Sequence, residues 1–166
     1  MFLRWLISLY LISTMVHAAP CPDWLNQTFK RLHSSESVNL CELYDGKPLV
    51  IVNTASHCGF TPQLKALETL SQQVQVIGFA SDSFNQEAAT EAEAAEVCYK
   101  NFGVTFTMLA PTAVKGPEAN PVFAALAQQS KPPAWNFNKY LILPGQDGVA
   151  VTHFGSSTAP ADIIKP

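Results

Sequence analysis

The chain has 166 residues, which is about the length of one domain. It carries 13 acidic and 10 basic side chains, for a formal net charge of −3, and so lacks the basic excess that a nucleic-acid-binding surface requires. Hydrophobic residues make up 48% of the chain and charged residues 14%, which is enough apolar material for one sizeable core and too much for a disordered chain.

The first 18 residues have the pattern of a secretory signal peptide. Arg4 is their only Lys, Arg, Asp or Glu, an apolar stretch spans 5–16, and Ala18 precedes the expected cleavage site. An uncleaved membrane anchor is the alternative, but the apolar stretch is shorter than the ~20 residues that a membrane span needs. We therefore expect a signal peptide over 1–18, one mature domain over 19–166, and export to a bacterial periplasm, where disulfides can form.

In the first half of the mature chain the hydrophobic pattern predicts two helices and three strands. Apolar residues at helical spacing predict a short helix within 23–35, and 39–43 is expected to be a strand that enters a turn. The continuous apolar run 48–53 predicts a central buried strand. A second helix is expected to begin at Thr61-Pro62, with a hydroxyl cap followed by proline, and a strand follows over 76–79.

In the second half the pattern continues with helices and ends in a hairpin. Residues 87–100 are rich in Ala and Glu and predict a helix, and 104–109 is a candidate third strand of the parallel unit. A short helix over 121–129 and a hairpin of 140–143 with 149–154 follow. This order predicts an α/β fold with a central mixed β-sheet flanked by helices.

Cys58 is the candidate nucleophile. The segment 53–62 connects the buried strand to a helix N-terminus, and Cys58 lies three residues before the expected cap. Unpaired backbone N–H groups and the positive end of a helix dipole favour a thiolate there, and Gly59 lets the backbone approach a bound oxyanion closely. A structural cysteine in a tight loop is the alternative that position alone leaves open.

Three stretches resemble motifs of the glutathione peroxidase family. Asn53-Thr-Ala-Ser-His-Cys-Gly-Phe-Thr-Pro-Gln63 is similar to the family's active-site motif in its cysteine form. Residues 97–106 resemble the segment that carries the resolving cysteine, and Trp135-Asn-Phe-Asn-Lys-Tyr140 resembles the second active-site motif. The resemblance covers about 38–161 and implies a thioredoxin-like fold that ends with a helix packed on the sheet. That helix would begin near Pro160, so either the chain is shortened or its last helix is rudimentary.

The resemblance also implies a mechanism without a metal or cofactor. Cys58 would attack a hydroperoxide and become a sulfenic acid, while Trp135 and Asn136 would donate hydrogen bonds to the sulfur and the peroxide. Cys98 would resolve the sulfenic acid into a Cys58–Cys98 disulfide. A thioredoxin-like protein or glutathione would then reduce that disulfide, and the presence of Cys98 favours the dithiol protein.

One stretch departs from the family pattern. Where the family reads Gly-Phe-Pro-Cys-Asn-Gln-Phe, this chain reads Gly78-Phe-Ala-Ser-Asp-Ser-Phe84, so the family's catalytic glutamine falls on Ser83 and its asparagine on Asp82. We hypothesise that Ser83 or a water fills the gap. Gln86 matches a later Gln-Glu pair of the family. His57 stands where the family often has lysine, and it either favours the thiolate when protonated or is simply exposed.

Cys21 and Cys41 lie outside these motifs and flank the first predicted helix. In an oxidising compartment they are expected to form a structural disulfide closing a loop of ~20 residues, with two free thiols as the alternative.

Two other functions stay open at this stage. One is a thiol–disulfide oxidoreductase acting on proteins, which is weakened because no second cysteine follows Cys58 within three residues. The other is a redox-sensing or binding module with little turnover. Residues 110–134 lack the longer segment through which tetrameric members of the family assemble, so a monomer is expected. Separately, no stable membrane insertion is expected after the signal peptide is cleaved.

Overall fold

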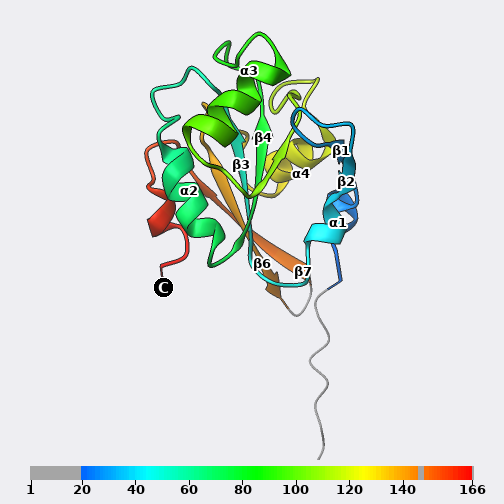
Figure 1. The fold of residues 1–166 in the computed structure, drawn as a ribbon. Coiled ribbons are helices and arrows are strands. Elements are labelled where there is room, and N and C mark those ends of the chain that lie inside the picture. Colours follow the sequence, from blue (N-terminus) through cyan, green and yellow to red (C-terminus); the bar gives the residue numbers. More distant parts are fainter. Residues whose placement is uncertain (1–19, 146–147, 166) are drawn as a thin grey trace, which may run out of the picture.

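A five-stranded mixed sheet forms the centre of the molecule (Figure 1). The computed structural model describes residues 20–145 and 148–165. The strand order is β5-β4-β3-β6-β7, in which β3, β4 and β5 are parallel, β6 is antiparallel to β3, and β7 is antiparallel to β6. The strands are β3 (Leu49–Thr54), β4 (Gln75–Ala80), β5 (Thr107–Leu109), β6 (Lys139–Gly145) and β7 (Gly148–Phe154).

The central strand β3 is buried along its whole length, as its uninterrupted apolar sequence predicted. It pairs with β4 on one side and β6 on the other, and both faces of the sheet are covered. Val50 and Val52 point into one hydrophobic cluster and Leu49 and Ile51 into another. This alternation places one half of the core on each side of the sheet.

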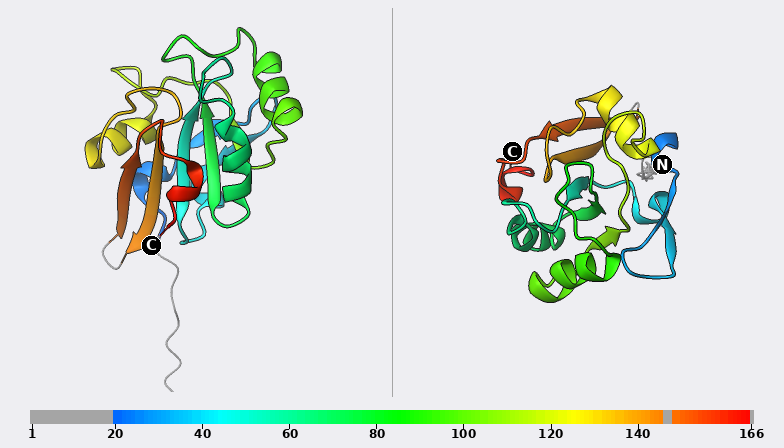
Figure 2. Two further views of the ribbon diagram at one scale, coloured as in Figure 1. Left: turned by 90° about the vertical axis from the view of Figure 1, so that its left-hand side faces the viewer. Right: turned by 90° about the horizontal axis from the view of Figure 1, so that it is seen from above.

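Helical segments cover the two faces (Figure 2). On one face lie α2 (Gln63–Ser71), α3 (Glu91–Ala95) and the π-helical turn Glu96–Asn101 that continues α3. On the other lie α4 (Pro121–Gln129), with Val122, Phe123 and Leu126 buried, and the N-terminal segment. The α/β class and the predicted helix at 121–129 are confirmed.

The N-terminal segment differs from the prediction. In place of a helix within 23–35 there is one 3₁₀ turn, Asp23–Leu25, followed by strand β1 (Thr28–Lys30), which pairs with β2 (Ser37–Asn39). The predicted strand at 39–43 is wrong as well, because Leu40–Leu43 forms the short helix α1. Asn39 caps α1 by accepting a hydrogen bond from the Cys41 N–H at 2.9 Å, and this local bond competes with strand pairing.

One helix boundary and one strand boundary also differ, whereas the last helical element begins at Pro160 as expected. The acidic helix begins at Glu91 rather than at 87, because Thr90 and Glu93 form a capping box at its start. Strand β5 is limited to 107–109. The expected C-terminal helix is a single 3₁₀ turn, Pro160–Asp162, followed by Ile163, which is buried in the same cluster as the apolar face of α2.

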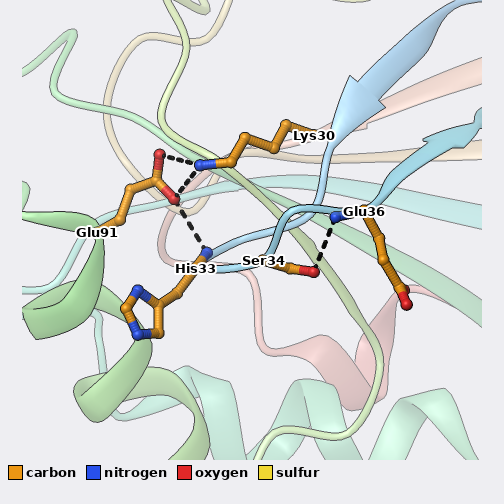
Figure 3. A network of polar contacts seen from close by, with 5 residues as sticks. All are labelled: Lys30, His33, Ser34, Glu36 and Glu91. Carbon is orange, nitrogen blue, oxygen red and sulfur yellow. Dashed lines mark hydrogen bonds and ion pairs between the residues drawn. The ribbon is translucent and has the colours of Figure 1, made fainter.

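A polar cluster attaches the β1–β2 hairpin to the first residue of α3 (Figure 3). The Glu91 carboxylate accepts hydrogen bonds from Lys30 Nζ at 2.7 and 2.8 Å and from the His33 N–H at 3.0 Å. The hydrogen bond from Lys30 lowers the pKa of Glu91. The pair is exposed and contributes at most about 1 kcal/mol to stability. It nevertheless fixes where α3 starts relative to the hairpin.

No helix within residues 20–145 and 148–165 is long and apolar enough to cross a membrane. The predicted signal peptide at 1–18 lies outside the described residues.

A disulfide joins Cys21 and Cys41, with their Cα atoms 5.7 Å apart, as expected from the sequence. It links the start of the described chain to α1 and closes a loop whose ends are 20 positions apart. The loop contains the whole β1–β2 hairpin.

Replacing both cysteines, Cys21→Ser with Cys41→Ser, should lower the free energy of unfolding by about 3 kcal/mol, because the unfolded chain regains the entropy of an open loop. Urea unfolding of the oxidised wild type and the double variant measures the difference. Equal midpoints, or two alkylatable N-terminal thiols in the wild type, would contradict the prediction.

Candidate active site

The candidate residues gather at one edge of the sheet. Cys58 lies in the loop that follows the carboxyl end of β3, and Ser83 and Gln86 lie in the loop that follows β4. Trp135 and Asn136 precede β6, which runs antiparallel to β3 with Lys139 opposite Val52. The beginning of β6 therefore lies at the same edge as the ends of β3 and β4, which is where α/β sheets commonly bind ligands.

Cys58 is buried, with 7% of its surface exposed, in a loop whose backbone is hydrogen-bonded to the Thr61 side chain. Its N–H donates to Thr61 Oγ1 at 3.1 Å, and Thr61 Oγ1 donates to the Ala55 carbonyl at 2.8 Å. The Phe60 N–H lies 3.5 Å from Cys58 Sγ. Thr61 thus stabilises the cysteine loop, while α2 begins at Gln63. The sulfur is faced by a backbone donor, as expected for a cysteine just before a helix.

Asn53, the fifth residue of β3, holds the second motif against the first. Its Nδ2 donates to the Trp135 carbonyl at 3.1 Å, and its Oδ1 accepts from the Asn138 N–H at 3.1 Å. Its carbonyl accepts from the Phe137 N–H at 2.7 Å. Phe137 is fully buried with a φ of 60°, a left-handed conformation that is costly for a bulky side chain. The Asn53 contacts hold this strained turn in place.

The loop at 155–158 supports the same motif from the other side. Ser156 Oγ donates to the Asn136 carbonyl at 2.6 Å, and Gln63 Nε2 donates to the Ser156 carbonyl at 2.7 Å. The fully buried Lys139 donates to the carbonyls of this loop, at 3.3 Å to Gly155, 3.1 Å to Ser156 and 2.8 Å to Thr158. Burial lowers the pKa of Lys139 to about 8. These supports were not predicted from the sequence.

Trp135 and Asn136 differ sharply in exposure. Trp135 is 41% exposed, and its ring lies against Phe84 with centroids 5.3 Å apart. Asn136 is fully buried, and its Nδ2 donates to Gln86 Oε1 at 3.0 Å. Within the described part of the chain, Asn136 Oδ1 has no hydrogen-bond partner. A buried amide with an unused edge is uncommon and can serve a ligand.

Ser83, which occupies the position of the family's glutamine, has other partners. Its hydroxyl oxygen accepts hydrogen bonds from Ser81 Oγ and from the Val114 N–H, both at 3.0 Å. Among the described residues no hydrogen bond joins Ser83 to Cys58. The neighbouring Asp82 accepts from the Glu87 N–H at 3.1 Å. Ser83 connects the β4 loop to the segment after β5.

The contacts of Gln86 and Glu87 were missed by the sequence analysis. The Gln86 carbonyl accepts from the His57 N–H at 2.8 Å, so Gln86 contacts the residue before Cys58 and also Asn136. Glu87 Oε1 accepts from the Ser56 N–H at 3.1 Å and from the Ser56 hydroxyl. The Gln-Glu pair was visible as a motif match, but nothing in the local sequence indicated which loop it contacts.

Cys98 is 5% exposed and lies on the π-helical turn, in the same hydrophobic cluster as Cys58. The two cysteines are not joined by a disulfide. Burial, and to a lesser extent the charge of Glu87, raises the pKa of the Cys98 thiol to about 12. Cys98 is therefore held as a protonated thiol.

A pocket of about 460 Å³ lies between the two cysteine-bearing segments. Its lining includes the exposed His57, which precedes Cys58, and Val97, which precedes Cys98. Glu93 and Glu96 also line it and give it an acidic wall. Within residues 20–145 and 148–165, no group of three or more His, Cys, Asp or Glu side chains is arranged to hold a metal ion.

Residues 24–127 match the family model described as glutathione peroxidase. The chain is 38% identical over 141 residues to the glutathione peroxidase of Lactococcus lactis, an alignment that covers 78% of this chain and 88% of that protein. The chain belongs to the glutathione peroxidase family. It is accordingly a peroxidase, an oxidoreductase that acts on a peroxide.

Other relatives and solved structures agree with this assignment. The chain is 41% identical to the glutathione peroxidase-like peroxiredoxin GPX5 of Chlamydomonas reinhardtii, over 72% of this chain and 79% of that protein. The crystal structure of apo Trgpx superposes with a TM-score of 0.62 at 29% identity, covering 84% of this chain and 89% of that chain. GPX1 of T. cruzi gives a TM-score of 0.63 at 24% identity, covering 84% and 90%. The predicted thioredoxin-like fold is confirmed.

The environment of Cys98 leads to a prediction for its reactivity. In a Cys58→Ser variant, the folded reduced protein should react with iodoacetamide at Cys98 about 10³-fold more slowly at pH 8 than the urea-unfolded chain does. At that pH a thiol with a pKa of about 12 is far less ionised than an ordinary cysteine. The rate should rise about tenfold per pH unit as the thiolate fraction grows. Mass spectrometry of digests measures it, and equal rates in folded and unfolded protein would contradict the prediction.

Proposed function

We propose that the protein reduces hydrogen peroxide or organic hydroperoxides through Cys58. The thiolate sulfur attacks one peroxide oxygen, the O–O bond breaks, and water or an alcohol leaves after taking up a proton. The sulfur is oxidised to a sulfenic acid. The observation that carries this proposal is the convergence of the Cys58 loop and the Trp135–Asn136 turn at one edge of the sheet, joined through Asn53.

Trp135 and Asn136 are proposed to stabilise the charge that moves during this step. The indole N–H and the carboxamide N–H are donors of the kind that stabilise developing negative charge in a site shielded from water. Asn136 is already buried and held, while Trp135 lies partly exposed over Phe84. The Phe60 N–H near the sulfur is a third donor.

Cys98 is proposed to resolve the sulfenic acid. Its sulfur attacks the Cys58 sulfur, the S–O bond breaks, water leaves, and a Cys58–Cys98 disulfide forms. This requires local opening, because Cys98 is buried and its thiol is protonated. The π-helical turn 96–101 is proposed as the part that opens, since π-helical turns are rare and occur frequently at functional sites. Its upstream end is held by the α3 capping box and by the Lys30–Glu91 pair.

The reductant is proposed to be a thioredoxin-like dithiol protein rather than glutathione. A dithiol reduces an intramolecular disulfide by thiol–disulfide exchange, and its second thiol resolves the mixed disulfide that forms on the way. The pocket between the cysteine segments carries Glu93 and Glu96, which would repel the carboxylates of glutathione. We further propose that the protein acts as a monomer, which light scattering on the purified chain tests.

Variants of the two cysteines should separate the two steps. Cys58→Ser should abolish peroxide consumption, because it removes the nucleophile. Cys98→Ser should still consume about one equivalent of hydrogen peroxide and form a dimedone-reactive sulfenic acid, but turnover with a thioredoxin and its reductase should fall at least about 100-fold. Stopped-flow tryptophan fluorescence and mass spectrometry measure the two steps.

The wild-type protein with stoichiometric peroxide is the reference, and it should yield a Cys58–Cys98 disulfide. Glutathione in place of the thioredoxin should support slower turnover. A wild type that reduces protein disulfides but ignores peroxide would instead indicate a thiol–disulfide oxidoreductase, and no reaction with either would indicate a binding module.

We also propose that the chain is exported to a bacterial periplasm. The signal-like pattern of 1–18 and the Cys21–Cys41 disulfide support this, since disulfides persist mainly in oxidising compartments. The full chain expressed in a Gram-negative host should be recovered from the periplasm with an intact mass that lacks residues 1–18. Recovery from the cytoplasm with the leader attached would contradict the proposal.

A further inference from the structure

We infer that Gln86 is the positioning residue that replaces the family's missing glutamine by fixing the buried Asn136 amide beside the Cys58 loop. This inference rests on the proposed role of Asn136 in the peroxide reaction. It assigns to Gln86 a task that the sequence resemblance placed at Ser83.

Besides Asn53, Gln86 also connects the two motifs at this edge of the sheet. Its main-chain carbonyl accepts from the His57 N–H at 2.8 Å, which fixes the backbone immediately before Cys58. Its side-chain Oε1 accepts from Asn136 Nδ2 at 3.0 Å. One residue therefore sets both the position of the nucleophile loop and the orientation of the Asn136 amide.

In the stretch 78–84, which departs from the family pattern, the other polar side chains already have hydrogen-bond partners. The Ser83 hydroxyl accepts from Ser81 and from the Val114 N–H, and the Asp82 carboxylate accepts from the Glu87 N–H. Asn85 has a left-handed backbone with a φ of 55°, which turns the chain just before Gln86. The turn brings the Gln86 amide to Asn136, three positions later than the family's glutamine.

The contact leaves the rest of the Asn136 amide unused by the described protein. Only one Nδ2 hydrogen is taken by Gln86, and Oδ1 is buried without a partner. Because Asn136 is fully buried, its amide cannot reorient at low cost once Gln86 holds one edge. The remaining N–H is thereby held ready as a preorganised donor to the reacting groups, and the C=O as an acceptor.

A double-mutant cycle tests whether Gln86 acts through Asn136. The measured quantity is the second-order rate constant for oxidation of Cys58 by hydrogen peroxide, taken by stopped-flow fluorescence. We expect Asn136→Ala to slow the reaction about 100-fold and Gln86→Met about 10- to 30-fold. The double variant should be no slower than Asn136→Ala alone, since residues that act as one unit are not additive.

The matched control is Gln128→Met, which makes the same change at an exposed glutamine on α4 and should leave the rate within about twofold. Retention of the Cys21–Cys41 disulfide and of the circular dichroism spectrum shows that a variant is folded. In NMR spectra, the Asn136 side-chain amide of Gln86→Met should lose protection from hydrogen exchange. This readout needs no peroxide, so it separates a failure of the inference from a failure of the proposed function.

Three outcomes would overturn the inference. The first is a double variant whose loss is the product of the two single losses, and the second is an unchanged Asn136 amide signal in Gln86→Met. The third is a normal rate in Gln86→Met together with a large loss in Ser83→Ala. A wild type that fails to react with peroxide while the Asn136 signal changes as expected would reject the proposed function and leave the Gln86 contact supported.

Discussion

The site of this peroxidase depends on the antiparallel pairing of β3 with β6 and on the Asn53 side chain at the end of that pairing. Asn53 uses both ends of its amide to hold the Trp135–Asn138 turn, including a phenylalanine in a left-handed conformation. Strain of this kind persists where the surroundings over-determine the backbone. The same residue begins the segment that leads to Cys58, so one buried amide sets the Cys58 loop and the Trp135–Asn138 turn relative to each other.

The two unpaired cysteines have environments suited to different steps. Cys58 has a backbone N–H facing its sulfur, whereas Cys98 is buried on a π-helical turn with its proton retained. In the proposed mechanism, burial protects the Cys98 thiol until the turn opens, and the cost of opening is then part of the resolution step. The N-terminal hairpin contributes to this control, because it is closed by the Cys21–Cys41 disulfide and attached through Lys30 to the first residue of α3.

Long apolar segments and the hairpin were predicted well. Few structures are compatible with the hydrophobic patterns of these segments, which form β3, β4, α4 and the hairpin of β6 and β7. The helix predicted within 23–35 was wrong because the few apolar residues there suit a helix or a strand equally. The pairing of β1 with β2 decides for strands. At 39–43 a single side-chain cap on Asn39 outweighed a short apolar pattern.

By itself, the sequence determined the family, the α/β class, Cys58 as the candidate nucleophile and the pairing of Cys21 with Cys41, because these are encoded in local motifs and their order. Only the tertiary structure decided that Ser83 is engaged elsewhere, that Asn53 and the loop at 155–158 support the second motif, and that Gln86 contacts Asn136. Hydrogen bonds between residues 50 or more positions apart, as between Gln86 and Asn136, depend on how the sheet brings loops together, and no local pattern carries that information.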